Sequence, residues 1–321
     1  MKMLLFIVTA AVVFVAATNG ANANFKGVAS LYGSSTTSLR TALWWGTATT
    51  FCGSLAAAVL ASGLLKQFSG RGLVTDALAA TPLFVAAVGI GAASTSLLAT
   101  RYGFPVSTTH ALVGALVGAG FAGGGGVQWA ALGKNFVMPL IVSPLLAALV
   151  AAVLYPLLKA LHLAPAHRTV ALDAAHFAST GGASFARGLN DAPKMAALLM
   201  AVPDADPTVA IFTVALAMAV GGLAGGRRVA ETLGKQVTDM DPGQGFAVSL
   251  ATAGLVTTAS LHSLPVSTTH VSVGALVGLG STTRQAHWRK IVEIFFAWVT
   301  TVPCGAILAA AAWWALSTVA G

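Results

Sequence analysis

Long apolar runs dominate the chain, and short polar connections separate them. A helix needs about 20 mostly apolar residues to cross a bilayer. Runs of this kind cover Leu43–Leu65, Thr81–Ala99, Phe136–Leu158, Thr208–Leu223 with its flanks, and Ile291–Leu316. This pattern predicts an all-α fold in which several helices cross a membrane.

The composition favours a membrane protein as well. The chain has 321 residues, of which 56% are apolar and only 8% are charged. Soluble domains carry roughly 25% charged residues, so this chain could not cover a surface that faces water. We expect a multi-pass protein that is surrounded by the lipid bilayer of the cell (inner) membrane.

The net charge of +8 does not indicate a nucleic-acid partner. The Lys and Arg residues are scattered through short connections, where membrane topology signals and anionic headgroups account for them. The interleaved aromatic and basic residues that bind single strands are absent.

A duplicated segment shows how the chain is organised. The hexapeptide PVSTTH occurs at 105–110 and again at 265–270. It opens a longer match between residues 105–120 and 265–280, in which thirteen of sixteen positions are identical. Such self-similarity is typical of an internal repeat.

Other landmarks extend the repeat over the whole chain. The stretch GANANFKG at 20–27 aligns with GLNDAPKM at 188–195, which pairs Asn22 with Asn190 and Lys26 with Lys194. Downstream, two tryptophans and two prolines recur at an offset of 159. We therefore divide the chain into two transmembrane units, residues 1–165 and 166–321.

The first residues imitate a secretory signal. Lys2 precedes the apolar run Met3–Ala17, and Ala21-Asn22-Ala23 has the A-x-A form of a cleavage site. The repeat gives Asn22 a functional position, so we expect this segment to be retained.

Each half contains an interrupted apolar segment and one short segment. The Gly/Asn/Lys clusters at 19–27 and 181–195 interrupt the first, and the PVSTTH segments span only sixteen residues before glycines end them. These short segments fit re-entrant hairpins better than full crossings. Their GxxxG pairs, Gly114/Gly118 and Gly274/Gly278, let another helix approach closely. Two related halves with broken helices predict a secondary transporter with a site at the repeat interface.

The PVSTTH segments are candidates for an anion site. A proline followed by hydroxyl residues is typical of a helix start, and a helix N-terminus attracts anions. We expect six hydroxyls to bind a small tetrahedral oxyanion between the two halves: Ser107, Thr108, Thr109, Ser267, Thr268 and Thr269. The alternative is that Ser107 and Ser267 are only N-caps.

Asn190 and Asp191 form a candidate cation site. An ionisable residue inside an apolar segment is costly and is typical of a functional site. Its carboxylate and amide oxygens suit Na⁺ or a proton, although a salt bridge from Asp191 to Lys194 or Arg187 is an alternative.

Four accessory residues have open roles. Lys26 and Lys194 could offset the charge of a substrate or extend to the membrane interface. His110 and His270 end the two motifs, where they are either structural hydrogen-bonding groups or a source of pH dependence.

Two G-x-N-D type motifs, each followed by P-V-S-T-T-H and G-A-L-V-G, make the chain resemble the inorganic phosphate transporter (PiT) family. The resemblance covers nearly the whole chain. It implies a symporter of inorganic phosphate coupled to Na⁺ or H⁺, built from inverted repeats with re-entrant hairpins, and a homodimer. It also implies that the hydroxyls at 107–109 and 267–269 bind phosphate, while Asn22, Asn190 and Asp191 lie in or beside the cation sites.

One position departs from the family pattern. The first motif of the family reads G-A-N-D, whereas this chain has Gly20-Ala21-Asn22-Ala23. The methyl group of Ala23 can neither bind Na⁺ nor accept a proton. We expect one cation site to be weak or absent and coupling to be reduced or lost.

Two alternatives remain beside a phosphate symporter. A sulfate permease would use the same hydroxyl lining, and a channel or a non-transporting sensor would fit the missing carboxylate. An enzyme is not expected, because the sequence has neither a P-loop GxxxxGK[ST] nor an HExxH motif. Apart from the coupling ion, we expect no cofactor and no metal.

Overall fold

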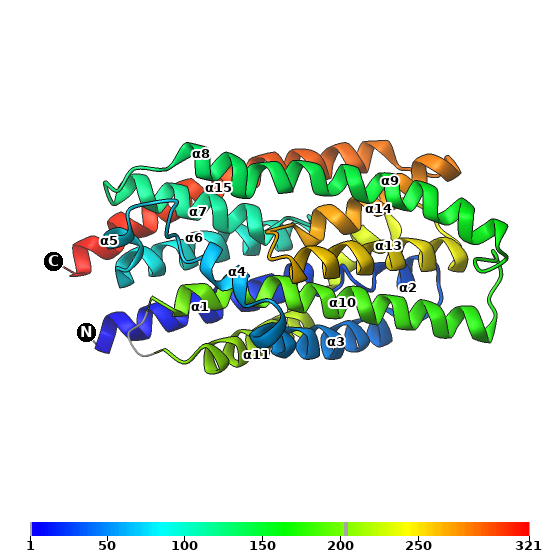
Figure 1. Cartoon of the computed structure of the whole chain (residues 1–321), viewed down its shortest axis with the longest axis horizontal. Helices are drawn as coiled ribbons and strands as arrows, with labels where there is room; N and C mark the ends of the chain where they lie inside the picture. The colour runs from blue at the N-terminus through cyan, green and yellow to red at the C-terminus, as the bar shows by residue number, and fades with distance from the viewer. Residues whose placement is uncertain (1, 202–204, 321) are drawn as a thin grey trace.

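The computed structural model describes residues 2–201 and 205–320, and its helices lie mainly along one long axis (Figure 1). Sixteen helical elements account for most of these residues. In chain order they are α1 Lys2–Ala23, α2 Ala29–Gly33, α3 Leu39–Leu60, α4 Ser62–Gln67, α5 Asp76–Ala79, α6 Pro82–Arg101, α7 Thr108–Ala122, α8 Trp129–Leu132, the π-helix η1 Gly133–Val137, α9 Met138–Ala160, α10 Val170–Leu199, α11 Pro207–Gly225, α12 Arg227–Lys235, α13 Pro242–Leu261, α14 Thr268–Thr283 and α15 Trp288–Ala320.

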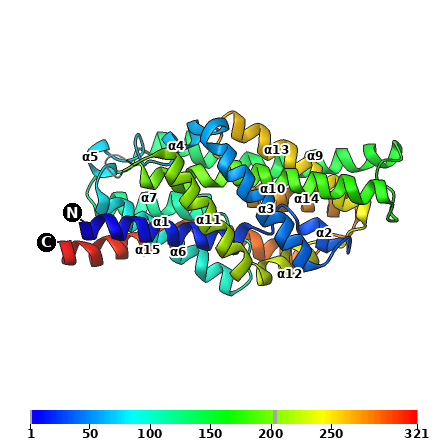
Figure 2. The same ribbon diagram turned by 90° about the horizontal axis from the view of Figure 1, so that it is seen from below.

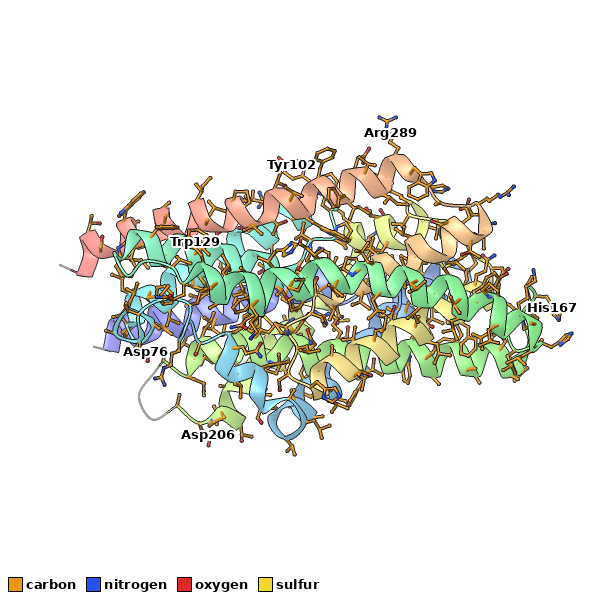
Figure 3. The ribbon with its side chains drawn as sticks, turned by 45° about the horizontal axis from the view of Figure 1, so that its top comes forward. Asp76, Tyr102, Trp129, His167, Asp206 and Arg289 are labelled. Atoms are coloured by element: carbon orange, nitrogen blue, oxygen red, sulfur yellow. The ribbon has the colours of Figure 1, made fainter. Side chains whose placement is uncertain are left out.

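Seven helical stretches in the described part are long and apolar enough to cross a membrane. They are Phe6–Ala23, Leu39–Leu60, Pro82–Arg101, Trp129–Ala160, Pro207–Gly225, Pro242–Leu261 and Trp288–Thr318. The predicted all-α, multi-pass class is therefore confirmed. Large apolar side chains remain exposed on the outside of the bundle, among them Trp129 and Tyr102, and the Tyr102 side chain projects outward in Figure 3. Such a surface is typical of a membrane protein.

Local signals set where the helices begin. Four of the long helices have proline in the first turn, and in three of them it follows an N-cap residue whose side chain accepts a hydrogen bond, Thr81, Asp206 or Asp241. The Asp241 side chain accepts from the backbone N–H of Gln244, and Gln244 Oε1 accepts from the backbone N–H of Asp241, which completes a capping box.

The two halves have opposite orientations. The final long helices of the halves, α9 and α15, run in opposite directions along the long axis (Figure 1). The chain ends lie together at one end of the molecule (Figures 1 and 2), while His167, in the connection between the halves, lies at the other end (Figure 3). This arrangement confirms an inverted repeat. The predicted division after residue 165 falls in that connection and stays a prediction.

The halves exchange their packing partners. The short helix α7 of the first half packs against α15 of the second, and α14 packs against α9 of the first. In the same way, α1 packs against α11 and α10 packs against α3. Neither half therefore forms a separate bundle.

The predicted GxxxG pairs lie at these exchanged contacts. A Cβ atom on Gly118 would collide with the backbone of Ala306 on α15, and one on Gly278 would collide with the backbone of Ala148 on α9. Gly114 and Gly274 make equivalent close approaches one turn away. The expectation that these pairs allow close helix packing is confirmed.

The interruption expected in both first segments is present only in the first half. There, α1 ends at Ala23, and the backbone N–H of Lys26 donates to the Ala23 carbonyl in a turn. The turn brings Gly27 directly against the backbone of Ser184. In the second half, α10 continues through Pro193 without a break, and its polar side chains reach their partners from this continuous helix.

Candidate functional site

The N-terminal ends of α7 and α14 meet near the middle of the molecule. Thr109 Oγ1 donates to the Val266 carbonyl at 3.5 Å, and Thr269 Oγ1 donates to the Val106 carbonyl at 2.9 Å. Each contact joins a helix start of one half to the residues that precede the helix start of the other. The two PVSTTH motifs thus form one pseudo-symmetric unit.

The serines of both motifs are N-caps. Ser107 Oγ accepts from the backbone N–H of His110 at 3.1 Å, and Ser267 Oγ accepts from that of His270 at 3.2 Å. Each proline lies two residues before its cap rather than in the first helical turn. The capping role considered from the sequence is therefore present, and the serine hydroxyls remain at the tips where an anion site was predicted.

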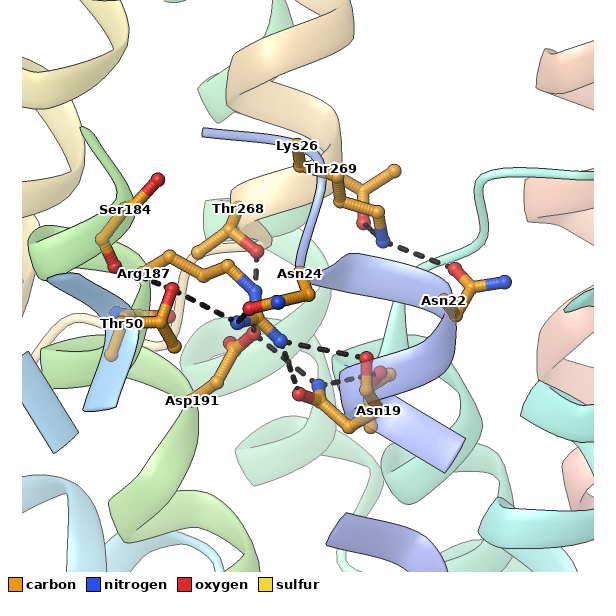
Figure 4. Close-up of polar contacts among 12 residues, drawn as sticks. Asn19, Asn22, Asn24, Lys26, Thr50, Ser184, Arg187, Asp191, Thr268 and Thr269 are labelled. Carbon is orange, nitrogen blue, oxygen red and sulfur yellow. Dashed lines mark hydrogen bonds and ion pairs between the residues drawn. The ribbon is translucent and has the colours of Figure 1, made fainter. Parts of the chain in front are cut away.

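Lys26 lies in a cage of oxygen atoms. Its Nζ donates to Asn22 Oδ1 at 3.2 Å and to the Val106 carbonyl at 2.7 Å. A third bond, of 2.5 Å, goes to Thr269 Oγ1 of the other half (Figure 4). Only 3% of Lys26 is exposed, so the side chain is buried and does not extend to the membrane interface.

Lys194 lies in the equivalent cage of the second half. Its Nζ donates to Asn190 Oδ1, to the Val266 carbonyl at 2.7 Å and to Thr109 Oγ1 at 2.9 Å. These partners correspond one by one to those of Lys26. A fourth contact, with Asp191 Oδ1 at 3.3 Å, has no counterpart in the first half, because Ala23 lies at the position that matches Asp191.

The amide groups of Asn22 and Asn190 connect these cages to the neighbouring helices. Asn22 Nδ2 donates to Thr100 Oγ1 and to the Phe104 carbonyl, both at 2.9 Å. Asn190 Nδ2 donates to Ser260 Oγ at 3.0 Å. Thr100 and Ser260 are themselves related by the repeat, so the second layer of contacts follows the same symmetry.

Asp191 connects the lysine cages to the threonine tips. Its Oδ2 accepts from Asn19 Nδ2 at 3.3 Å and from Thr268 Oγ1 at 3.4 Å. Asn19 Nδ2 also donates to Thr108 Oγ1 at 2.9 Å. The carboxylate is therefore one hydrogen bond from Thr268 and one bridging amide from Thr108.

Arg187 completes the buried network. Its Nη2 donates to Asn19 Oδ1 at 2.6 Å, and its Nε lies 3.7 Å from Asp191 Oδ2. Its Nη1 donates to Asn24 Oδ1 at 3.2 Å and to Thr50 Oγ1 at 3.3 Å (Figure 4). The salt bridges that were the alternative for Asp191, to Lys194 and to Arg187, are both present.

His110 and His270 lie side by side behind the tips. Their ring centroids are 4.5 Å apart, and the His270 ring lies 3.8 Å from the ring of Trp298. The Nδ1 atom of each is buried without a hydrogen-bonding partner among the described residues. The Trp298 Nε1 donates to the Pro105 carbonyl at 3.0 Å, which holds the tip of the first motif.

The structure gathers the predicted site residues around the meeting tips. Sequence reasoning did not identify five further members of the network, which are Asn19, Asn24, Thr50, Thr100 and Ser260, and it considered Arg187 only as a salt-bridge partner of Asp191. A usable signal was present, because Asn19 matches Arg187 and Thr100 matches Ser260 in the repeat. Long-range partners such as Thr50 had no comparable signal.

Comparisons with known proteins agree with this architecture. A sequence model of the phosphate transporter family matches residues 19–173 and, a second time, residues 164–309. A probable low-affinity inorganic phosphate transporter of Rhizobium meliloti is 30% identical over 78% of this chain and 79% of its own. Proteins with the same description from Mycobacterium leprae (28% identity, 95% of this chain and 76% of that protein) and Bacillus subtilis (30%, 72% and 73%) are also similar.

One solved structure shares the fold. It is described as the sodium-dependent phosphate transporter and superimposes with a TM-score of 0.87 over 98% of this chain and 99% of its own, at 24% identity. Since the two matches of the family model together span most of the sequence, the chain belongs to the phosphate transporter family, a class of membrane carriers and not of enzymes.

Proposed function

We propose that the protein is a secondary carrier of inorganic phosphate whose substrate binds where the starts of α7 and α14 meet. In this proposal, α6 with α7 and α13 with α14 are the two re-entrant hairpins, and their tips lie near the middle of the bilayer. The carrier lies in the cell (inner) membrane, where ion gradients are available. We also propose that it forms a homodimer.

The charge of the buried network is the observation that carries this proposal. Among the buried side chains that the structure describes, Lys26, Arg187 and Lys194 oppose a single carboxylate, Asp191. With histidines counted as neutral, the centre has two uncompensated positive charges. Such charges inside a membrane protein are costly unless a counter-ion is present. Hydrogen phosphate, with two negative charges, would supply the missing balance.

The helix starts add hydrogen-bond donors to this charge. The first backbone N–H groups of a helix have no intrahelical acceptor, and the helix dipole favours an anion there. The hydroxyls of Thr108 and Thr268 lie at these starts, and both threonines are buried. Two helix starts that meet tip to tip therefore surround a small tetrahedral anion with donors from both halves.

The carboxylate of Asp191 favours phosphate over sulfate as the substrate. An ionised carboxylate repels an anion that has no proton, but it accepts a charge-assisted hydrogen bond from a protonated one. At neutral pH, phosphate has at least one proton and sulfate has none. A carboxylate one hydrogen bond from the Thr268 hydroxyl therefore favours phosphate as the substrate.

We assign coupling to the second half. Asp191 is the one buried carboxylate among the described residues, and together with Asn190 it offers the oxygens for Na⁺ or for a proton. An uncoupled carrier is the second candidate. It is favoured by Ala23, because the first half has a buried methyl group where the second has this carboxylate.

Uptake of labelled phosphate into proteoliposomes tests the proposal. Uptake should saturate with phosphate and rise when an inward Na⁺ or proton gradient is imposed. Equal uptake with and without either gradient would favour the uncoupled carrier, and the absence of any protein-dependent uptake would contradict both candidates.

A pair of substitutions tests where phosphate binds. Thr108→Val with Thr268→Val removes two tip hydroxyls, keeps the side-chain size and leaves the serine caps in place. We expect phosphate uptake to fall by at least about tenfold, since a hydrogen bond to a charged group contributes about 1.5–3 kcal/mol. Thr282→Val with Thr283→Val is the matched control, because these hydroxyls bond within α14 at its other end.

A further inference from the structure

Lys26 occupies a position that resembles the site of a bound monovalent cation. Its Nζ contacts an amide oxygen, a backbone carbonyl oxygen and a hydroxyl oxygen, all within 3.2 Å. Oxygen atoms of these three types are the ligands that hard cations take in proteins. The ammonium group uses its three hydrogens on three oxygens, so the cage is fully engaged by a charge that belongs to the chain.

The two lysine cages differ in one respect. Lys194 lies beside the carboxylate of Asp191, whereas Lys26 has no ion pair among the described residues. At the position that matches Asp191, the first half has Ala23, which is 1% exposed. Both oxygen cages contain a cationic side chain, but only the first half lacks a carboxylate that could serve as the anionic ligand of a free cation.

We propose that Lys26 is a tethered cation that takes the place of a coupling Na⁺ in the first half. This inference rests on the proposed phosphate transport, because Lys26 then balances the substrate charge as a co-transported ion would. A group that is attached to the chain has a high effective concentration in its cage. A Na⁺ entering beside it would add a third uncompensated positive charge to the centre.

Substitution of Lys26 should therefore create a response to Na⁺. Lys26→Asn removes the ammonium group from the cage and introduces an amide oxygen, and the added substitution Ala23→Asp supplies the missing carboxylate. Together they remove the net positive charge of the buried network, which leaves the centre able to accept one cation with one anion. We expect the double variant to bind one more Na⁺ than the natural chain.

The test measures Na⁺ binding in the absence of phosphate. The melting temperature of each purified protein in detergent is compared in sodium chloride and in choline chloride at equal ionic strength. Lys26→Asn, with and without Ala23→Asp, should show a larger stabilisation by Na⁺ than the natural chain, and Lys235→Asn, a change on α12 outside the buried network, should not. Equal stabilisation in all four proteins overturns the inference.

Two further measurements keep the outcome distinct from that of the proposed function. If Lys26→Asn does not fold, Lys26→Gln, which keeps a longer side chain, is measured in the same way. In proteoliposomes, phosphate uptake by the double variant should rise more steeply with external Na⁺ than uptake by the natural chain. A natural chain that takes up no phosphate contradicts the proposed function, while the melting comparison still tests the lysine.

Discussion

Asp191→Asn tests the electrostatic design of the site most directly. The change keeps the shape of the side chain but removes the one negative charge among the buried groups described. In the proposed site, the carboxylate of the natural chain accepts a hydrogen bond from protonated phosphate and repels sulfate. In the variant, the amide can donate to either anion, and the two anions then meet a centre that has three positive charges.

The contacts of Asp191 set the size of the effect. A hydrogen bond to a charged group contributes about 1.5–3 kcal/mol, and about 1.4 kcal/mol corresponds to a factor of ten. The preference for phosphate over sulfate should therefore fall about 10- to 100-fold. Stability should fall too, because Lys194 at 3.3 Å and Arg187 at 3.7 Å lose their partner. Breaking a buried ion pair in this way costs about 3–5 kcal/mol.

Competition in proteoliposomes measures the preference. The concentration of sulfate that halves labelled phosphate uptake is divided by the phosphate KM, and this ratio should fall in Asp191→Asn. Asp173→Asn is the control, since Asp173 lies on the same helix but pairs with Arg168 at 2.6 Å at the end of the molecule. An unchanged ratio in Asp191→Asn would refute the assignment of Asp191 as the group that selects phosphate.

Three further substitutions test other parts of the structure. Gly118→Val should destabilise the protein by about 1–3 kcal/mol, because its side chain would collide with the backbone of α15. Gly254→Val is the control, because the space around Gly254 is open. Equal melting temperatures of the two variants would contradict the close approach at Gly118. Lys194→Met should raise the phosphate KM at least about tenfold through the loss of a charged donor. A KM equal to that of the exposed control Lys235→Met would contradict a role of Lys194 in phosphate binding. Trp298→Phe removes the hydrogen bond to the Pro105 carbonyl and should lower the free energy of unfolding by about 1–3 kcal/mol. Denaturation is followed by the fluorescence of the remaining tryptophans or by light scattering.

The duplicated segments made much of the architecture predictable. Identical spacing of Asn22 and Lys26 with Asn190 and Lys194 revealed two halves, and the apolar runs revealed membrane helices. The same repeat predicted that the two PVSTTH segments would lie together, because a pseudo-symmetric interface brings equal positions together. The GxxxG pairs indicated close packing correctly, but they could not say which helix approaches, since that depends on the exchange between halves.

The remaining features depend on contacts that sequence spacing does not encode. Arg187 binds Asn19, 168 residues away, although the two occupy matching positions in the repeat. That departure from symmetry arises because one half contributes the cation and the other the amide. Likewise, α10 passes through Pro193 without a break, because hydrogen bonds and packing around a buried helix can outweigh the local preference to end it.

The exchanged packing has a consequence for biogenesis. If one half of the sequence were inserted alone, the GxxxG face of its short helix, α7 or α14, would lack the long helix of the other half that packs against it. A split carrier expressed as two polypeptides should therefore assemble only when both are present, with opposite insertion in the membrane. Only halves inserted in opposite orientations would then assemble, since a half that is inserted the wrong way round could not form the exchanged contacts.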